Sequence, residues 1–381
     1  MFDFDERIER RGSWSTRWER FPQDVIPLWV ADTDFRLPPA VRAALARRVE
    51  HGVLGYSVNP APLRDALVER LHRLYGWRVE PEWVVFVSGV VPGLHLAARH
   101  LTEPDEHVLV PTPVYHHLTR APEVAGRAYA KVPLVLERGR WVWDEDALAA
   151  SVRPESRLLM LCNPQNPGGT IFTREELARL AAFAVKHDLV ICSDEIHAEI
   201  LLDEGKPHVP IASLSPEASR RTVTLLSPNK AFGFPGAGCS FAVIEDAALR
   251  RAFSVDHHAT VHDASVFGYE AALAAYRECD DWLRAQLDYL RANRDLVERE
   301  IAGTGSLQMA HVEATYLAWI DASALGAADP HKHFLDHGVA MSPGAQFGDA
   351  RFVRLNFGTR RALLAEALKR ISSASRQSPR G

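Results

Sequence analysis

From residue 84 onward, short runs of aliphatic and β-branched residues alternate with segments of helical periodicity. This alternation is typical of a parallel or mostly parallel sheet that is covered by helices on both faces. We therefore predict an α/β fold. The predicted strands are VVFVS (84–88), HVLVP (107–111), RLLMLC (157–162), LVICS (189–193), TVTLLS (222–227) and CSFAVI (239–244).

Two of the helices carry recognisable start signals. Thr173 is followed three residues later by Glu176, which predicts a capping box before a run of apolar residues at helical spacing. Pro60 opens another helix with leucines on one face, and Gly76 can end it.

The sequence also predicts two domains. A long helical stretch over 264–302 stops at Gly303 and can connect them. Beyond it, the predicted elements are typical of a small α+β domain: YLAWI (316–320), a helix near Pro330, RFVRLNF (351–357) and a final helix from about residue 360. We predict a large domain over residues 46–265 and a small domain formed by residues 1–45 and 266–381.

Charge and composition exclude several classes of function. The 381 residues include 44 Lys and Arg against 49 Asp and Glu, and the net charge of −5 is spread along the chain. Nucleic acids and membranes are therefore not expected as partners. The N-terminus lacks the apolar core of a signal peptide, so we expect a soluble, cytoplasmic protein. The four cysteines form no Cys-x-x-Cys pair, and no metal site is expected.

Candidate ligand-binding residues follow four of the predicted strands, where open α/β sheets place their ligands. Ser88–Gly93 lies at a junction of strand and helix, where backbone N–H groups can approach a phosphate, although a glycine there is more often a simple turn. Asn163–Gly169 contains two prolines and two glycines, which fix an irregular loop and can aim the Asn166 amide at a ligand oxygen.

Two charged residues follow the next strands. Asp194 ends an apolar strand, where a carboxylate is costly unless a cation pairs with it. Lys230 lies in the loop after another buried strand, in the sequence Ser227-Pro228-Asn229-Lys230. Alone, such a lysine is more often a solvated surface charge. The order and spacing of all four segments nevertheless favour a ligand-binding role for them.

In combination, these segments resemble the fold-type I pyridoxal-phosphate enzymes of the aminotransferase class I/II superfamily. The sequences LWVADTDF (28–35), Gly52 to Tyr56, Ser88 to Pro92 and Asp194-Glu195-Ile196-His197 resemble its cystathionine β-lyase, or carbon–sulfur lyase, branch. The resemblance covers nearly the whole chain. It implies the transferase fold type I, with a mostly parallel, seven-stranded-type sheet between helices in the large domain, and pyridoxal 5′-phosphate (PLP) as cofactor.

The resemblance also implies roles for individual residues. Lys230 would form the Schiff base, Asp194 would face the pyridine nitrogen, and Tyr115 would stack on the ring. The other cofactor-binding residues would be Asn166 and His197 near the ring oxygen, Gly89, Val90 and Ser227 at the phosphate, and Tyr56 from the other subunit of a homodimer. Arg354 would bind the substrate carboxylate, with Asn166 and Tyr56 nearby.

Elementary chemistry requires these residue types. A free lysine has a pKa of about 10.4 and is a poor base until its surroundings lower that value. A carboxylate beside the ring nitrogen keeps the ring protonated, so that the ring can accept electrons. The planar fork of Arg354 matches a carboxylate. One position departs from the pattern of some aminotransferases, which have a phosphate-binding arginine where this chain has Gly238.

We therefore expect α,β-elimination from L-cystathionine or a related L-cysteine thioether, giving pyruvate, ammonia and a thiol. The first alternative is an aminotransferase of a small amino acid, which uses the same residues. The second is a non-catalytic PLP-binding module of a regulator, which the lack of a helix-turn-helix segment and of a basic face disfavours.

Overall fold

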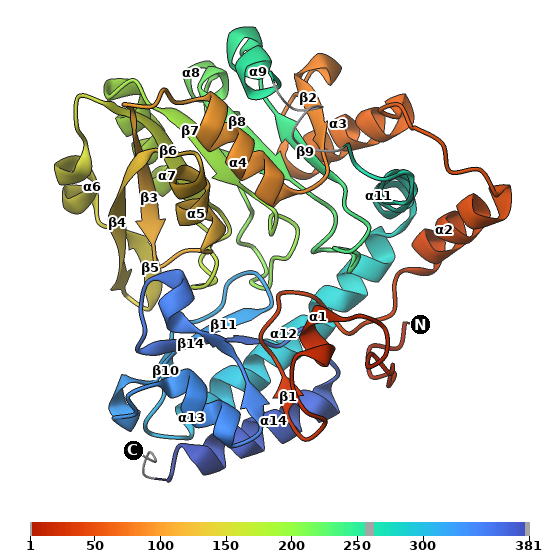
Figure 1. Ribbon diagram of the computed structural model, residues 1–381, viewed down its shortest axis with the longest axis vertical. Helices are drawn as coiled ribbons and strands as arrows, with labels where there is room; N and C mark the ends of the chain where they lie inside the picture. Colours follow the sequence, from red (N-terminus) through yellow and green to blue (C-terminus); the bar gives the residue numbers. More distant parts are fainter. Residues whose placement is uncertain (1, 256–262, 378–381) are drawn as a thin grey trace.

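The computed structural model describes residues 2–255 and 263–377, and its central feature is one large mixed sheet (Figure 1). The strand order is β2-β9-β8-β7-β6-β3-β4-β5. The strands are β2 (Val84–Val87), β3 (His107–Thr112), β4 (Ala128–Glu137), β5 (Arg140–Trp143), β6 (Ser156–Cys162), β7 (Val190–Asp194), β8 (Thr222–Leu226) and β9 (Ser240–Val243).

The centre of this sheet is parallel. Strands β8, β7, β6, β3 and β4 all run in one direction, while β2, β9 and β5 pair antiparallel at the two edges. The residues of β7 and β8 are all buried, as expected for strands covered on both faces. The six predicted strands and the α/β fold class are confirmed. The sheet has eight strands instead of the expected seven, because β5 adds an edge strand beside β4.

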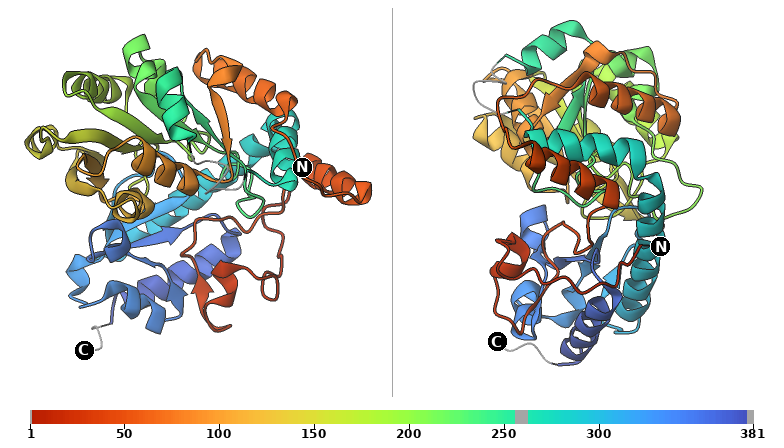
Figure 2. Two further views of the ribbon diagram at one scale, coloured as in Figure 1. Left: turned by 45° about the horizontal axis from the view of Figure 1, so that its top comes forward. Right: turned by 90° about the vertical axis from the view of Figure 1, so that its right-hand side faces the viewer.

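Helices cover both faces of the large sheet (Figure 2). One face packs against α4 (Val90–His100), α5 (His117–Val124) and α9 (Ala247–Phe253). The other packs against α6 (Glu145–Ser151), α7 (Arg174–Lys186) and α8 (Pro216–Arg220). Helix α7 begins with the predicted capping box, in which Thr173 and Glu176 each bond the other's backbone N–H.

Helix α3 (Ala61–Tyr75) follows Pro60 and ends at Gly76, as predicted. It packs with α11 (Val266–Glu278), which in turn contacts α2 (Pro39–His51). The predicted helical stretch over 264–302 is helical as expected and ends before Gly303, but it breaks at Cys279 into α11 and α12 (Asp280–Ala302). Cys279 leaves helical geometry with φ −117° and ψ 17°, which lets α12 leave in a new direction.

A second group of elements lies below the large sheet in Figure 1. It contains the sheet β10-β11-β14-β13 and the parallel pair β1-β12, together with α1 (Thr16–Glu19), α13 (Pro330–Asp336) and α14 (Arg361–Ala374). The strands are β1 (Ile26–Pro27), β10 (Gln308–Met309), β11 (Leu317–Asp321), β12 (Val339–Ala340), β13 (Ser342–Pro343) and β14 (Phe352–Asn356). The pairing of β1 with β12 joins the N-terminal segment to this group. The domain bounds given above stay a prediction.

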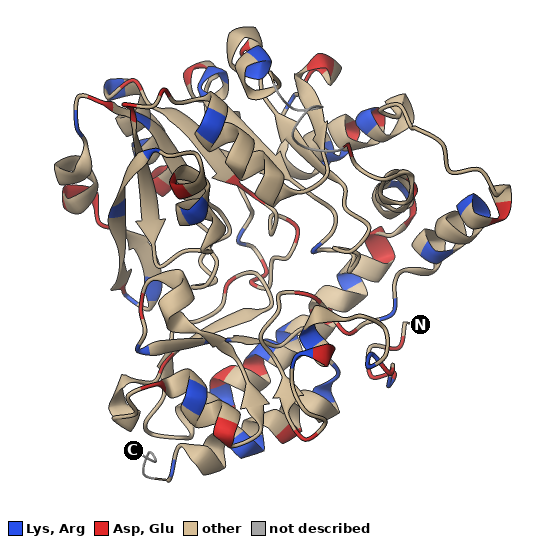
Figure 3. Cartoon of the chain, in the orientation of Figure 1, with Lys and Arg blue, Asp and Glu red and all other residues tan. Residues whose placement is uncertain are grey.

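Helix α12 runs from the large sheet into the second group, and Figure 3 shows acidic and basic residues interspersed along it. Its exposed side carries pairs three residues apart, Asp281 with Arg284 and Asp288 with Arg291. Its other side buries Leu290, among other residues. None of the helices in the described part of the chain is long and apolar enough to cross a membrane.

Candidate active site

A cavity of about 370 Å³ lies at the carboxyl ends of the central strands, between the large sheet and the second group of elements. Four of the predicted site residues line it after β6, β7 and β8: Asn166, Asp194, His197 and Lys230. The cavity is also lined by Gly89, Val90 and Tyr115 of the large-sheet region and by Arg354 of the second group. The structure thus brings together side chains from segments that lie far apart in the sequence.

Two predicted residues lie outside this cavity. Ser227 is buried beside it, where its hydroxyl donates to Cys239 O at 2.8 Å and accepts from the Asn229 N–H at 3.1 Å. Tyr56 is fully exposed in the segment between α2 and α3. Because Tyr56 is expected to act in the other subunit, its exposure in one chain agrees with that expectation without testing it.

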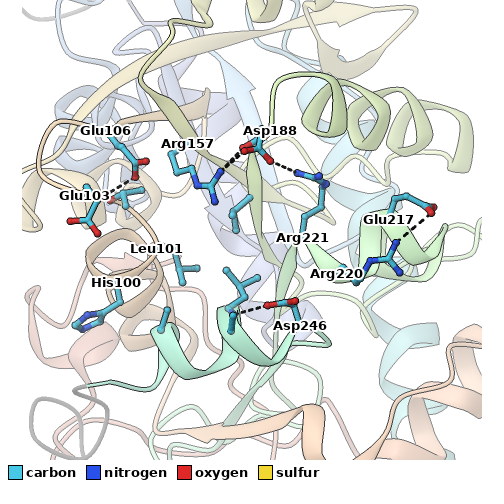
Figure 4. A pocket seen from close by; sticks show the side chains of 15 residues that line it. His100, Leu101, Glu103, Glu106, Arg157, Asp188, Glu217, Arg220, Arg221 and Asp246 are labelled. Carbon is cyan, nitrogen blue, oxygen red and sulfur yellow. Dashed lines mark hydrogen bonds and ion pairs between the residues drawn. The ribbon is translucent and has the colours of Figure 1, made fainter.

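A second pocket, of about 560 Å³, lies at the opposite edge of the large sheet (Figure 4). Arg157 and Arg221, at the starts of β6 and β8, both pair there with Asp188, at 2.8 and 3.6 Å. Arg220 pairs with Glu217 at 3.4 Å, and Asp246 caps α9. These charges satisfy one another, and none of the predicted site residues lines this pocket.

Lys230 lies on the loop after β8, and its ammonium group donates to the backbone oxygen of Ala31. Lys230 is half-buried, and loss of water around its ammonium group lowers its pKa to about 8, which nearby Asp32 partly opposes. No carboxylate within ion-pair distance of Lys230 is found in the described residues. A lysine of lowered pKa is the form that reacts with an aldehyde near neutral pH.

Asp194 ends β7 with only 3% of its surface exposed. Burial raises the pKa of its carboxyl to about 7, while the Ile196 N–H, which donates to it at 3.2 Å, acts in the opposite direction. In residues 2–255 and 263–377 no cationic side chain forms an ion pair with it, so the expected cation is not supplied by the protein there. A protonated ring nitrogen would supply that charge and keep Asp194 ionised.

The turn after Asp194 is fixed by a buried pair. Glu195 accepts from the Ser193 hydroxyl at 2.8 Å and lies 2.7 Å from His208 Nε2. The next residue but one, His197, is almost fully buried, and burial lowers its pKa to about 3, so its imidazole is neutral. Its Nδ1 has no partner in the described structure. A neutral imidazole with a free nitrogen can bond a ring oxygen.

Arg354 projects from β14, and its guanidinium is held by neutral oxygens. It donates to Asn166 Oδ1 at 3.0 Å, to Trp29 O at 3.0 Å and to Ser342 Oγ at 3.3 Å. Its Nε has no partner, and the described residues offer it no carboxylate. Burial lowers its pKa to about 10, which still leaves it charged at neutral pH. An arginine that is only 4% exposed and lacks an anion is suited to bind one from a ligand.

The oxygen and the nitrogen of the Asn166 amide have different partners. Its oxygen accepts from Arg354, so its NH₂ group is what remains to donate to a ligand oxygen. Tyr115 follows β3, and burial raises the pKa of its phenol to about 12, so it is neutral. A direct hydrogen bond therefore links the Arg354 and Asn166 side chains in the cavity wall.

Among the described residues, Arg354 is the only arginine that lines the cavity, and none lies at its end near Ser88 and Gly89. Gly238 has φ +63°, and a Cβ there would lie 3.0 Å from Ser88 O, so a larger residue would be strained at this position. Instead, helix α4 begins at Val90 directly after Gly89, and its N-terminal N–H groups and dipole favour an anion. The buried Ser240 hydroxyl, which has no partner among the described residues, also lines the cavity.

The site fits PLP on these observations. It combines a helix N-terminus for a phosphate, a lysine of lowered pKa for an aldehyde, and a buried carboxylate without a protein cation for a ring nitrogen. Sequence reasoning missed several residues of the cavity walls, namely His116, His117, Gln346 and Phe347. The histidines directly follow Tyr115, which was a usable signal, whereas nothing in the sequence marks Phe347.

The lowered pKa of Lys230 predicts how the cofactor-free protein takes up PLP. Only the neutral amine attacks an aldehyde, so the rate should rise about tenfold per pH unit below pH 8 and level off above it. Stopped-flow absorbance between pH 6 and 10 measures this rate. A rate that keeps rising to pH 10 would show an unshifted lysine instead.

The chain is similar to known proteins over nearly its whole length. The family model for aminotransferase class I and II matches residues 23–371. The cystathionine β-lyase PatB of Bacillus subtilis is 34% identical, over 98% of this chain and 99% of PatB. The crystal structure of OvoB has a TM-score of 0.97 at 46% identity, covering 99% of this chain and 100% of that one. A PLP-bound C–S lyase from Staphylococcus hominis has a TM-score of 0.93 at 28% identity, covering 99% of each chain.

Proposed function

Since the chain belongs to the aminotransferase class I and II family, we propose that it is a PLP-dependent carbon–sulfur β-lyase that cleaves L-cysteine thioethers such as L-cystathionine. The expected family, enzyme class and cofactor are confirmed by the relatives of the lyase branch. The substrate and the role of each residue are our proposal. One observation carries it: Lys230 and the anion-free Arg354 line the same cavity as the buried Asp194.

Each residue of the proposed site has a separate role in the reaction. Arg354 binds the substrate α-carboxylate and fixes which bond at Cα faces Lys230. Lys230 accepts the Cα proton as general base. When bound, the cofactor accepts the electron pair that the Cα–H bond leaves behind. Asp194 remains ionised beside the ring nitrogen, and Asn166 and His197 donate to or accept from the ring oxygen.

In the elimination, every bond that breaks is matched by a proton or a water that is taken up. The Cβ–S bond breaks with its electron pair on sulfur, and Lys230 can deliver the proton that turns the thiolate into a thiol. The remaining three-carbon unit takes up one water and yields pyruvate and ammonia. Incubation of the purified enzyme with L-cystathionine should therefore give pyruvate, ammonia and thiol in equal amounts. Formation of a keto acid that retains the sulfur would contradict the proposal.

We also propose a cytoplasmic homodimer whose two active sites share residues. The segment between α2 and α3, which is neither helix nor strand, exposes four apolar side chains, Val53, Leu54, Tyr56 and Val58. Solvent-exposed apolar residues in one run are typical of an interface. In the dimer, Tyr56 would reach the phosphate end of the other subunit's cavity.

Complementation tests this shared site. Tyr56→Ala and Lys230→Ala should each be strongly impaired, but a refolded mixture should regain about a quarter of the wild-type activity, because each hybrid dimer contains one intact site. Sedimentation at the assay concentration should show dimers throughout. A mixture no more active than its components, or a fully active monomer, would refute the shared site.

A further inference from the structure

One segment of the cavity wall has no part in the reaction described so far. It consists of residues 29–32, which we call the strap, and three of its residues line the cavity. The Asp32 N–H donates to Val30 O at 3.0 Å, which closes a tight turn centred on Ala31. The carbonyl of Ala31 accepts from the ammonium group of Lys230. The strap therefore contacts the residue that takes the Cα proton in the proposed reaction.

Asn356 holds the strap on both sides of Ala31. It lies on β14 with no exposed surface, and its NH₂ group donates to Val30 O and, at 2.7 Å, to Asp32 O. Its Oδ1 accepts from the Gly358 N–H at 2.7 Å, so rotation of the amide would break all three hydrogen bonds. The two carbonyls that flank Ala31 are thus bound to Asn356, while the Ala31 carbonyl is left for Lys230.

Two further side chains hold the strap in place. The hydroxyl of the buried Tyr316 donates to Ala31 O at 3.2 Å. The fully buried Arg17 donates to Asp32 O at 3.2 Å and pairs with the Asp32 carboxylate at 3.4 Å. A backbone carbonyl has two lone pairs, so Ala31 O can accept from Tyr316 and Lys230 together. The carbonyl is therefore fixed before any proton reaches Lys230.

Lys230 gains a positive charge when it removes the Cα proton. The proton passes from Cα to Nζ, and the electron pair of the C–H bond stays with the substrate and the bound cofactor. Within the described part of the chain, the hydrogen bond from this Nζ goes to Ala31 O, and no carboxylate forms an ion pair with it. A fixed carbonyl dipole can stabilise a developing positive charge, as fixed N–H groups stabilise an oxyanion.

We propose that Asn356 and Tyr316 are positioning residues, which hold the carbonyl of Ala31 where it stabilises the ammonium form of Lys230 during removal of the Cα proton. This inference rests on the part of the proposed function that makes Lys230 the general base. It does not depend on the fate of the sulfur group, because a lyase and an aminotransferase share this step. All the groups involved belong to one chain.

Exchange of the Cα proton of L-alanine with solvent deuterium isolates this step, because alanine has no leaving group on Cβ. The holoenzyme is incubated with saturating L-alanine in deuterium oxide, and proton NMR follows the loss of the Cα–H signal. Tyr316→Phe keeps the ring and removes one hydrogen bond, so it should lower the maximal exchange rate about three- to tenfold. Asn356→Ala frees the carbonyls on both sides of Ala31 and should lower that rate about ten- to a hundredfold.

Tyr129→Phe is the matched control. It also removes one side-chain hydrogen bond, which Tyr129 donates to Glu123 at 2.7 Å, but Tyr129 lies outside the cavity. Its exchange rate should equal that of the wild type. The dissociation constants of PLP and alanine, from the absorbance of the cofactor, and the Tm are measured for every variant. A positioning role lowers the maximal exchange rate while the affinity for alanine stays the same, whereas a purely structural role does not.

Tyr316→Phe decides the outcome even if Asn356→Ala does not fold. A wild-type exchange rate in Tyr316→Phe, or a loss of exchange that saturating PLP and alanine restore, overturns the positioning role. If the variants slow the exchange but no thioether yields pyruvate, the positioning role is supported and the lyase function is contradicted. A wild-type enzyme that binds alanine without any exchange overturns both the general-base role of Lys230 and this inference.

Discussion

Replacing Lys230 by alanine should lower kcat/KM for pyruvate formation by at least about a thousandfold, since general-base catalysis alone contributes about 10²- to 10⁴-fold. The variant also loses the only amine that lines the cavity among the described residues. Lys230→Arg is the matched control, because it keeps the positive charge but stays protonated and forms no Schiff base. It should be as impaired as the alanine variant.

Borohydride reduction tests chemically whether Lys230 is the lysine that binds the cofactor. The wild-type protein should be yellow, and reduction should fix the cofactor on the peptide that contains Lys230. Lys206 pairs with Asp203 and Glu313 outside the cavity, and Lys332 pairs with Asp336. A labelled peptide containing another lysine, or an active Lys230→Ala variant, would overturn the assignment.

Replacing Arg354 by alanine should lower kcat/KM by about thirtyfold to several thousandfold, because losing one partner of a buried charge pair costs roughly 2–5 kcal/mol. The cofactor should still bind, because Asn166 is the only candidate ring-binding residue to which Arg354 is hydrogen-bonded in the described structure. Loss of the Arg354 charge should raise the pKa of Lys230, since that charge lowers it. Arg354→Lys is the control for charge, since lysine lacks the planar fork, and it should fall between the wild type and the alanine variant. An unaltered kcat/KM in the alanine variant would exclude the carboxylate role.

The central strands could be predicted because each one is visible in its own short stretch of sequence. Strands β6, β7 and β8 are buried on both faces, so they appear in the sequence as continuous apolar runs. Strands β4 and β5 were missed because most of their residues are exposed or half-buried, which leaves no such run. The break between α11 and α12 was missed because Cys279 is neither glycine nor proline, and packing determines it.

The candidate site also contains residues that the sequence indicated and residues that it did not. Asn166, Asp194 and Lys230 each lie in a compact motif at the end of a strand, so the sequence alone indicated them. The cation expected for Asp194 could not be identified from the sequence, because the described chain supplies none within ion-pair distance. Phe347 and Trp29 belong to segments that meet the large sheet only in the folded chain, and no sequence spacing brings them together.

The proposed reaction and that of an aminotransferase diverge after the same first step. Lys230 removes the Cα proton in both, so variants of this residue do not distinguish them. An aminotransferase must return a proton to the cofactor carbon, and it then holds its cofactor as the amine until a keto acid arrives. A lyase expels the sulfur group and regenerates its cofactor without a second substrate.

The most direct measurement is therefore the time course of pyruvate, ammonia and thiol from cysteine thioethers with no keto acid added, together with the absorbance of the cofactor. A carbon–sulfur lyase should release all three products over many turnovers while the absorbance of the resting enzyme persists. If the reaction stops after about one turnover with every thioether and resumes when a keto acid is supplied, the enzyme is an aminotransferase and the lyase proposal is wrong.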